Sequence, residues 1–241
     1  CSSDLSARVD PLFAQITKRQ SNKRVYDDTP VSAAQLAELA GSINHPGLGL
    51  TNEAGKRGKL ADIARLAMEI ETADKARDAE TIAMFRFNDE ERARFRDGFG
   101  VAQSGMSGLM KMVAETFFLD RRETEADSTD FGAQAVKITT DQANSAAAFG
   151  WITTPTNNRL DQLLTGRAYE RLNLKATELG LAMHPMSQVL QEYTDMTTLQ
   201  GQFLGLLDVA EGHTVQMLFR LGIAEPVSHS ARRRLTDIMR G

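Results

Sequence analysis

Cysteine and histidine are scarce in this chain, and their scarcity excludes several kinds of site. Cys1 is the single cysteine in 241 residues, so the chain can build neither a disulfide framework nor a thiolate metal site. The four histidines lie far apart in the sequence and show neither an HExxH motif nor any paired spacing typical of metal ligands. We therefore expect no metal centre.

Long apolar runs and a large charge of one sign are also missing. No stretch approaches the roughly 18 apolar residues that a membrane-spanning helix needs. A net charge of −4 does not indicate nucleic acid or an anionic membrane as a partner. Hydrophobic residues make up 41% and charged residues 25% of the chain, as in ordinary globular proteins. Any anion site must therefore be local.

The sequence starts at Cys1 rather than at a methionine, which indicates a processed or truncated terminus. Cys1-Ser2-Ser3 fits the start of a mature lipoprotein and equally fits an arbitrary cut, and no signal peptide is present to decide between them. Location is open: cytoplasmic, or periplasmic and membrane-anchored if Cys1 is a lipoprotein terminus.

The common catalytic motifs are absent as well. The chain contains no GxSxG, no Walker A loop and no GxGxxG. Carboxylate pairs such as Asp27-Asp28 and Glu90-Glu91 occupy polar turns, where solvated charge is the expected role. We therefore expect no catalytic acid, base or nucleophile, and any enzymatic chemistry would depend on a cofactor.

Helical spacing of apolar residues dominates the chain, with few strand-like runs. Helices are predicted at residues 5–16, 32–43, 53–76, 106–117, from 131 onward, and 160–179. Strands are predicted at 48–51, 146–154 and 215–221, and residues 81–87 fit either a strand or a helix end. No repeat or low-complexity linker interrupts the pattern, so it indicates one α+β or α/β domain, residues 1–241, with residues 1–17 as a helical extension.

Two basic clusters stand near the two ends of the chain, about two hundred residues apart. The first, residues 18–24, surrounds Ser21 with Arg19 and Lys23, and the second contains Arg232 and Arg234. Arg and Lys pair with phosphate oxygens, and a serine hydroxyl adds a hydrogen bond at the same anion. Each cluster alone also fits a solvated basic turn or tail. Together they make sense if both converge on one phosphate.

These clusters resemble motifs of the nitroreductase family. Residues 18–23, followed by Tyr26 and by Pro30-Val31 before a helix, resemble the family's flavin-phosphate motif, and Asn22 makes the stretch most similar to the Acg-like branch. Residues 166–181 and 185–187 resemble the long dimer helix and the loop after it, which in the family places a backbone N–H near the flavin N5 and O4. Residues 217–222 and 230–234 resemble the closing strand and its basic cluster.

The resemblance implies an α+β fold, nitroreductase-like, with a central mixed β-sheet surrounded by long helices, and FMN as the cofactor. The cofactor-binding residues that it implies are Arg19, Gln20, Ser21, Lys23, Met186, Ser187, Arg232 and Arg234. It further implies hydride transfer from NAD(P)H through the flavin to a small electron-poor acceptor.

One part of the family pattern is missing. Nitroreductases usually carry Pro-Ser-x-x-Asn and Gln-Pro-Trp stretches that hold the flavin ring from the partner subunit, whereas residues 44–51 here read NHPGLGLT. The chain is most similar to the C-terminal half of Acg-like proteins, which resemble two fused halves sharing one flavin. A homodimer or a second nitroreductase-like half is therefore expected. Two alternatives stay open: a non-catalytic flavin-sequestering protein and an interaction protein without cofactor.

Overall fold

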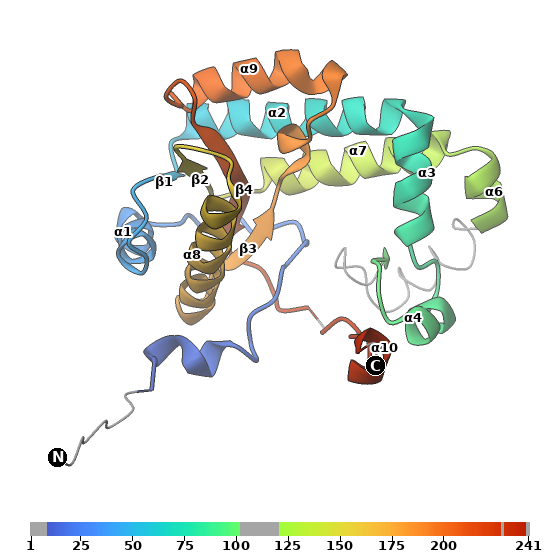
Figure 1. The fold of residues 1–241 in the computed structure, drawn as a ribbon, viewed down its shortest axis with the longest axis horizontal. Coiled ribbons are helices and arrows are strands. Elements are labelled where there is room, and N and C mark those ends of the chain that lie inside the picture. The colour runs from blue at the N-terminus through green and yellow to red at the C-terminus, as the bar shows by residue number, and fades with distance from the viewer. Residues whose placement is uncertain (1–8, 102–120, 228, 240–241) are drawn as a thin grey trace.

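The computed structural model describes residues 9–101, 121–227 and 229–239 (Figure 1). The longer helices are α1 (Ala33–Gly41), α2 (Ala54–Ala73), α3 (Lys75–Met84), α7 (Thr129–Asn144), α8 (Arg159–Glu178) and α9 (Thr197–Leu206). Shorter ones are η1 (Pro11–Gln15), α4 (Asp89–Phe95), α6 (Arg121–Ala126), η4 (Gln188–Leu190), η5 (Thr194–Met196) and α10 (Leu235–Ile238). None of these described helices has the length and apolar character to cross a membrane.

The predicted helices are confirmed as α1, α2, α7 and α8, and the helix predicted at 106–117 lies outside the described residues. The helix predicted over residues 5–16 is wrong for its described part, which is the single 3-10 helix η1. Pro11 stands at its start, where the ring fixes φ and removes a backbone donor. Residues 81–87 form the end of α3 and then an isolated bridge from Phe85 to Phe99.

The sheet has four strands in the order β1 (Leu48–Thr51), β2 (Ala148–Thr154), β4 (Thr214–Gly222) and β3 (Ala182–Pro185). All neighbouring strands are antiparallel, and a parallel bridge from Ser21 to Met183 extends the sheet beyond β3. The sheet was predicted to be mixed, and among the described residues its parallel pairing is limited to that one bridge. The three predicted strands are confirmed, whereas no strand was predicted at β3. It is short and contains a histidine and a proline, so no apolar alternation marks it.

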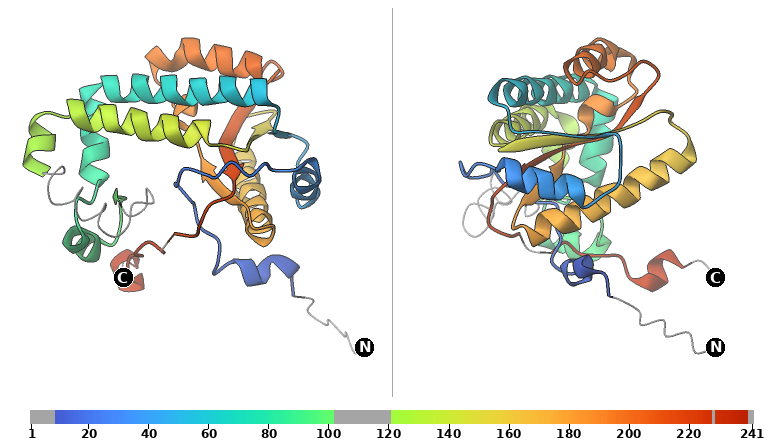
Figure 2. Two further views of the ribbon diagram at one scale, coloured as in Figure 1. Left: turned by 180° about the vertical axis from the view of Figure 1, so that it is seen from behind. Right: turned by 90° about the vertical axis from the view of Figure 1, so that its left-hand side faces the viewer.

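The sheet separates two hydrophobic cores. Helices α2, α7 and α9 cover one face, and α1 and α8 cover the other (Figures 1 and 2). Strand β2 alternates between them: Phe149 and Trp151 pack with the first group, whereas Ala148 and Ile152 pack with the second. This alternation is the period of a strand whose two faces are both covered.

Two local signals in the sequence account for helix boundaries. Ser32 and Gln35 form a capping box at the start of α1, because each side chain accepts from the other residue's backbone N–H, at 3.2 and 2.9 Å. After α8, Gly180 takes a positive φ of 71°, the left-handed conformation that ends many helices.

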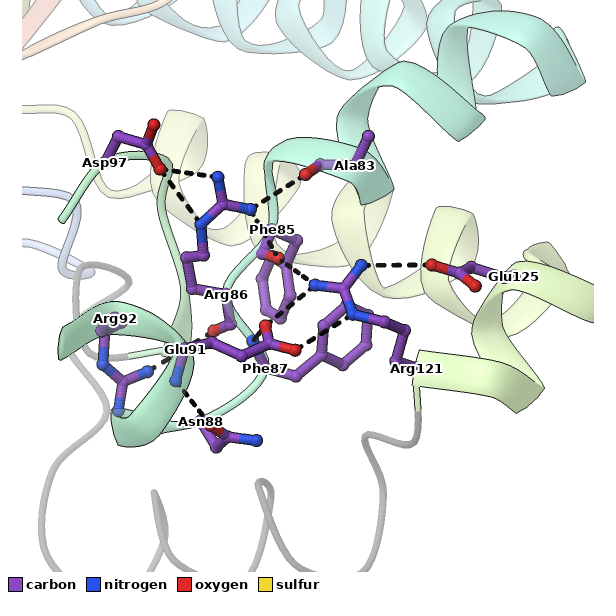
Figure 3. Close-up of polar contacts among 10 residues, drawn as sticks. All are labelled: Ala83, Phe85, Arg86, Phe87, Asn88, Glu91, Arg92, Asp97, Arg121 and Glu125. Atoms are coloured by element: carbon purple, nitrogen blue, oxygen red, sulfur yellow. Dashed lines mark hydrogen bonds and ion pairs between the residues drawn. The ribbon is translucent and has the colours of Figure 1, made fainter. Parts of the chain in front are cut away.

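A smaller cluster of aromatic residues under α3 forms the wall of the cavity described below. Polar contacts hold this wall in place (Figure 3). Arg121 donates to the Phe85 carbonyl at 2.9 Å and to Glu91 at 2.8 Å, while Arg86 pairs with Asp97 at 2.6 Å. Phe85 then meets Phe87, Phe99 and Phe131 edge to face, with ring centroids 4.9 to 5.4 Å apart.

Gly150 in β2 is expected to tolerate no side chain. A Cβ added there would lie 2.3 Å from the Phe219 ring and 2.7 Å from Leu50. We expect Gly150→Ala to lower the free energy of unfolding in urea by about 1–3 kcal/mol, the usual cost of overpacking. Gly201→Ala is the matched control: its Cβ meets open space within α9, so it should be neutral or stabilising by up to about 1 kcal/mol. Equal effects of the two substitutions would contradict this packing.

Candidate functional site

A cavity of about 850 Å³ lies between α2, α3, α7 and the segment that follows β3. This volume is within the usual range for small-molecule sites. Its larger apolar lining residues are Met68, Phe85, Phe99, Val101, Phe131, Ile138 and Met186. Its ionisable groups include Lys23 and His184 on the side of the sheet and Glu71 and Asp78 on the side of α2 and α3.

Lys23 brings a positive charge from the first basic cluster to this cavity. The side chain is partly buried, and its ammonium group lies 5.4 Å from the centre of the Phe99 ring. Burial lowers the pKa of Lys23. Within the described part of the chain, no carboxylate lies within ion-pair distance of this ammonium group. The cavity therefore has a cation in its wall without a counter-ion.

Arg220 is a second cation without a carboxylate partner among the described residues. It is fully buried in β4, and its guanidinium donates to the carbonyls of Gln142 at 2.7 Å and Arg24 at 2.6 Å. The group also stacks on Tyr26, 3.8 Å from the ring centre. Burial lowers the pKa of Arg220 to about 10, which leaves it charged at neutral pH.

His184 links Arg220 to the cavity. The two residues are cross-strand partners in β3 and β4, and Arg220 Nε donates to His184 Nδ1 at 3.1 Å. Because Nδ1 accepts, the imidazole proton must lie on Nε2. Burial, with the charges of Arg220 and Lys23, lowers the pKa of His184 well below its ordinary value. A neutral imidazole with a free Nε2–H donor therefore lines the cavity.

The first basic cluster is attached to the C-terminal segment by its neutral residues. The Val227 N–H donates to Gln20 Oε1, and Asn22 Nδ2 donates to the Glu225 carbonyl at 2.9 Å. The N-terminal segment (blue) and the C-terminal segment that follows β4 (red) cross in the left view of Figure 2. Gln20, expected at the phosphate, thus makes a structural bond with its side-chain oxygen.

Arg19, Ser21 and Lys23 alternate with Gln20 and Asn22, so in an extended chain they share the opposite side. Arg19 forms an ion pair with Glu170 on α8, with 3.0 Å between the guanidinium nitrogen and the carboxylate oxygen. Ser21 is exposed and lies at the bridge to Met183. Of the three, Lys23 alone lines the described cavity.

The second basic cluster lies beside the loop after α4. The Arg232 carbonyl accepts a bond from Arg96 at 2.7 Å, and Arg233 pairs with Asp97. Arg232 and Arg234 are both exposed, and neither lines the cavity. The structure therefore brings residues 225–227 to the first cluster, but it does not bring these two arginines to the Lys23 side of the cavity.

The loop after β3 contains the two residues expected near the flavin ring. Met186 is buried and lines the cavity, but its N–H donates to the Leu218 carbonyl at 2.8 Å. No carbonyl among the described residues accepts from the Ser187 N–H, so Ser187 keeps the free backbone donor. His184 and Arg220 were not expected from the sequence, because only the register of β3 against β4 brings them together.

No protein-family model matches the chain, and no curated protein matches it either. Solved structures, in contrast, share its fold over nearly its full length, and the chain has a nitroreductase-like α+β fold.

Three of these structures show the extent of the likeness. The nitroreductase-like family protein from Bacillus cereus has 16% identity and a TM-score of 0.52, covering 97% of this chain and 96% of that one. The FMN-dependent nitroreductase NfnB from Mycobacterium smegmatis in complex with NADPH has 16% identity and a TM-score of 0.57, covering 94% and 96%. A nitroreductase with bound FMN from Bacteroides fragilis has 14% identity and a TM-score of 0.51, covering 96% and 99%.

Proposed function

We propose that this chain is an FMN-binding oxidoreductase of the nitroreductase type. The observation that carries the proposal is the unpaired Lys23 at the wall of an apolar cavity, in a fold whose solved neighbours include proteins with FMN. Even partial burial of a cation without a counter-ion is unfavourable, so the retention of Lys23 here favours an anionic ligand. The residues present fit FMN, which needs a cation for its phosphate, hydrogen-bond donors for its polar edge and apolar walls for its ring.

Different residues would bind the phosphate, the polar edge and the apolar part of FMN. Lys23, with Ser21 and Arg19 on the same side of the stretch, would hold the phosphate. His184 Nε2–H and the Ser187 N–H would donate to the polar edge of the ring, and residues such as Met68 and Phe131 would exclude water from it. When bound, FMN supplies hydride transfer from NAD(P)H to a small electron-poor acceptor. The NADPH complex of the Mycobacterium smegmatis protein supports that donor.

We further propose that a second subunit, or a second half of an Acg-like protein, completes the ring site. Residues 48–51, within the stretch that lacks the family's ring-binding motif, form strand β1 and pair with β2. The first turns of α8 expose Leu160, Leu163 and Leu164 by 62%, 57% and 44%. Three exposed leucines on one helix favour a covered face in the assembled protein.

Titration of the purified chain with FMN tests the proposal. We expect quenching of flavin fluorescence and a higher melting temperature, because a ligand that binds the folded state stabilises it. NADPH oxidation in the presence of a quinone or nitroaromatic acceptor should then follow. Binding without turnover would instead indicate a flavin-sequestering protein. A colourless protein whose melting temperature FMN leaves unchanged would indicate an interaction protein without cofactor.

A further inference from the structure

The side of the cavity formed by α2 and α3 has two carboxyl groups, Glu71 and Asp78. Asp78 is only 3% exposed, and it lies in the first turn of α3. No described residue donates a hydrogen bond to its carboxylate or forms an ion pair with it. The helix N-terminus favours a negative charge at this position by about 0.3–1 kcal/mol. That is less than the several kcal/mol that burial of an unpaired charge costs.

The cation next to Asp78 in the sequence is bound elsewhere. Arg77 precedes Asp78 in α3, but both of its terminal nitrogens donate to the carboxylate of Asp195, at 3.0 and 3.1 Å. Its guanidinium also stacks on Tyr193, 3.7 Å from the ring centre. Among the described residues that line the cavity, Lys23 is the single lysine or arginine, and it belongs to the opposite side. The buried carboxylate of Asp78 therefore lacks a protein counter-ion.

Glu71 adds a second acidic group at the same place. Burial raises the pKa of Glu71 against the opposing charge of Arg77, and the neighbouring Asp78 raises it further. Two neighbouring carboxyl groups beside a cavity with apolar walls repel each other when both are charged, since charges interact more strongly there than in water. An entering cation or bidentate N–H donor would relieve this repulsion and would satisfy Asp78.

We propose that Glu71 and Asp78 form a binding site for the cationic group of a small aromatic ligand, such as an amidinium or a pyridinium. If the proposed flavin chemistry holds, on which this extension rests, the acceptors preferred by the chain carry a positive charge. Lys23 places a positive charge on one side of the cavity, whereas Glu71 and Asp78 on the other side, and Asp130 of α7, place carboxyl groups in its lining, so the cavity is dipolar. An anionic cofactor and a cationic acceptor are then directed to opposite sides.

Calorimetric titration with benzamidine and benzamide tests the site, because these probes are nearly isosteric and differ in charge. We expect benzamidine to bind at least about tenfold more tightly than benzamide to the chain, with and without FMN. Asp78→Asn should remove about tenfold of the benzamidine affinity, the value of one charge-assisted hydrogen bond. Glu71→Gln should lower it in the same direction. Asp62→Asn, which removes an exposed charge from α2, should leave it unchanged.

Turnover separates this inference from the proposed function. N-methyl-4-nitropyridinium and nitrobenzene are compared as acceptors, each reduced to its nitroso product by NADPH and a proton with release of water. In Asp78→Asn, the ratio of kcat/KM for the cation to that for the neutral acceptor should fall about tenfold. An unchanged ratio, or equal affinities for benzamidine and benzamide in the parent chain, would overturn the cationic site. Failure to reduce either acceptor would count against the proposed function, while the benzamidine titration would still test the site.

Discussion

Arg220→Met is expected to lower the free energy of unfolding by about 3 kcal/mol. The substitution removes the guanidinium donors from the Arg24 carbonyl at 2.6 Å and from His184 Nδ1 at 3.1 Å. The Gln142 carbonyl loses its bond at 2.7 Å but keeps the one from the Ser145 hydroxyl at 2.9 Å. A buried polar group without a partner costs about 1–3 kcal/mol, and the loss of the contact with Tyr26 adds to this. Urea unfolding of both proteins at pH 7.5 measures the difference.

Arg171→Met provides the matched control. Arg171 lies on α8, is about half exposed, and donates to the Asp10 carboxylate and, like Arg220, to a backbone carbonyl, that of Ser42. Exposed pairs of this kind contribute less than about 1 kcal/mol. Equal losses for the two substitutions would show that burial of Arg220 has no special role in the fold.

The contact between Arg220 and His184 predicts how the free energy of unfolding depends on pH. The folded-state pKa of His184 lies well below 6.5. Just below pH 6.5 the imidazole is therefore protonated in the unfolded chain and still neutral in the folded chain. The contribution of His184 is therefore complete above pH 6.5 and is lost as the pH falls below that value. In Arg220→Met the repulsion from the guanidinium is gone, so this acid-induced loss should be smaller. An unchanged pH profile would contradict the link between the two residues.

The parts of the fold that can be predicted from the sequence are those determined by local patterns. Helix α8 repeats its apolar residues at helical spacing from Leu160 to Leu179. Strand β2 is an apolar run up to Ile152, and β4 has apolar residues at every second position from Val215 to Leu221. Strand β3 has no such pattern, because its four residues contain His184 and Pro185 and become a strand only by pairing with β4. The sheet order is likewise a property of the packed chain.

The site divides in the same way. Lys23 can be identified from the basic stretch, because its charge is a feature of the sequence itself. Nothing in the sequence tells that Arg232 lies beside Arg96, since a basic cluster does not specify which neighbours it meets. Asp78 is equally inconspicuous: in the first turn of a helix, an acidic residue is usually a solvated charge. Its burial depends on how α2, α3 and α7 pack.

Lys23→Met is expected to weaken FMN binding at least about tenfold. A charge-assisted hydrogen bond contributes roughly 1.5–3 kcal/mol, and the methionine keeps the length of the side chain while removing the charge. The free energy of unfolding without FMN should stay the same or rise, because the ammonium group has no counter-ion among the described residues. Fluorescence titration with FMN and urea unfolding measure the two quantities separately.

Arg232→Met decides between the two versions of the phosphate site. If both basic clusters converge on the phosphate, as the sequence predicts, this substitution weakens FMN binding as much as Lys23→Met does. If the arrangement in the structure persists, with Arg232 exposed beside Arg96, FMN affinity changes less than about twofold. An unchanged affinity in Lys23→Met would remove Lys23 from the site altogether. A loss of affinity in both variants would instead show that the C-terminal segment moves toward the cavity when the anion binds.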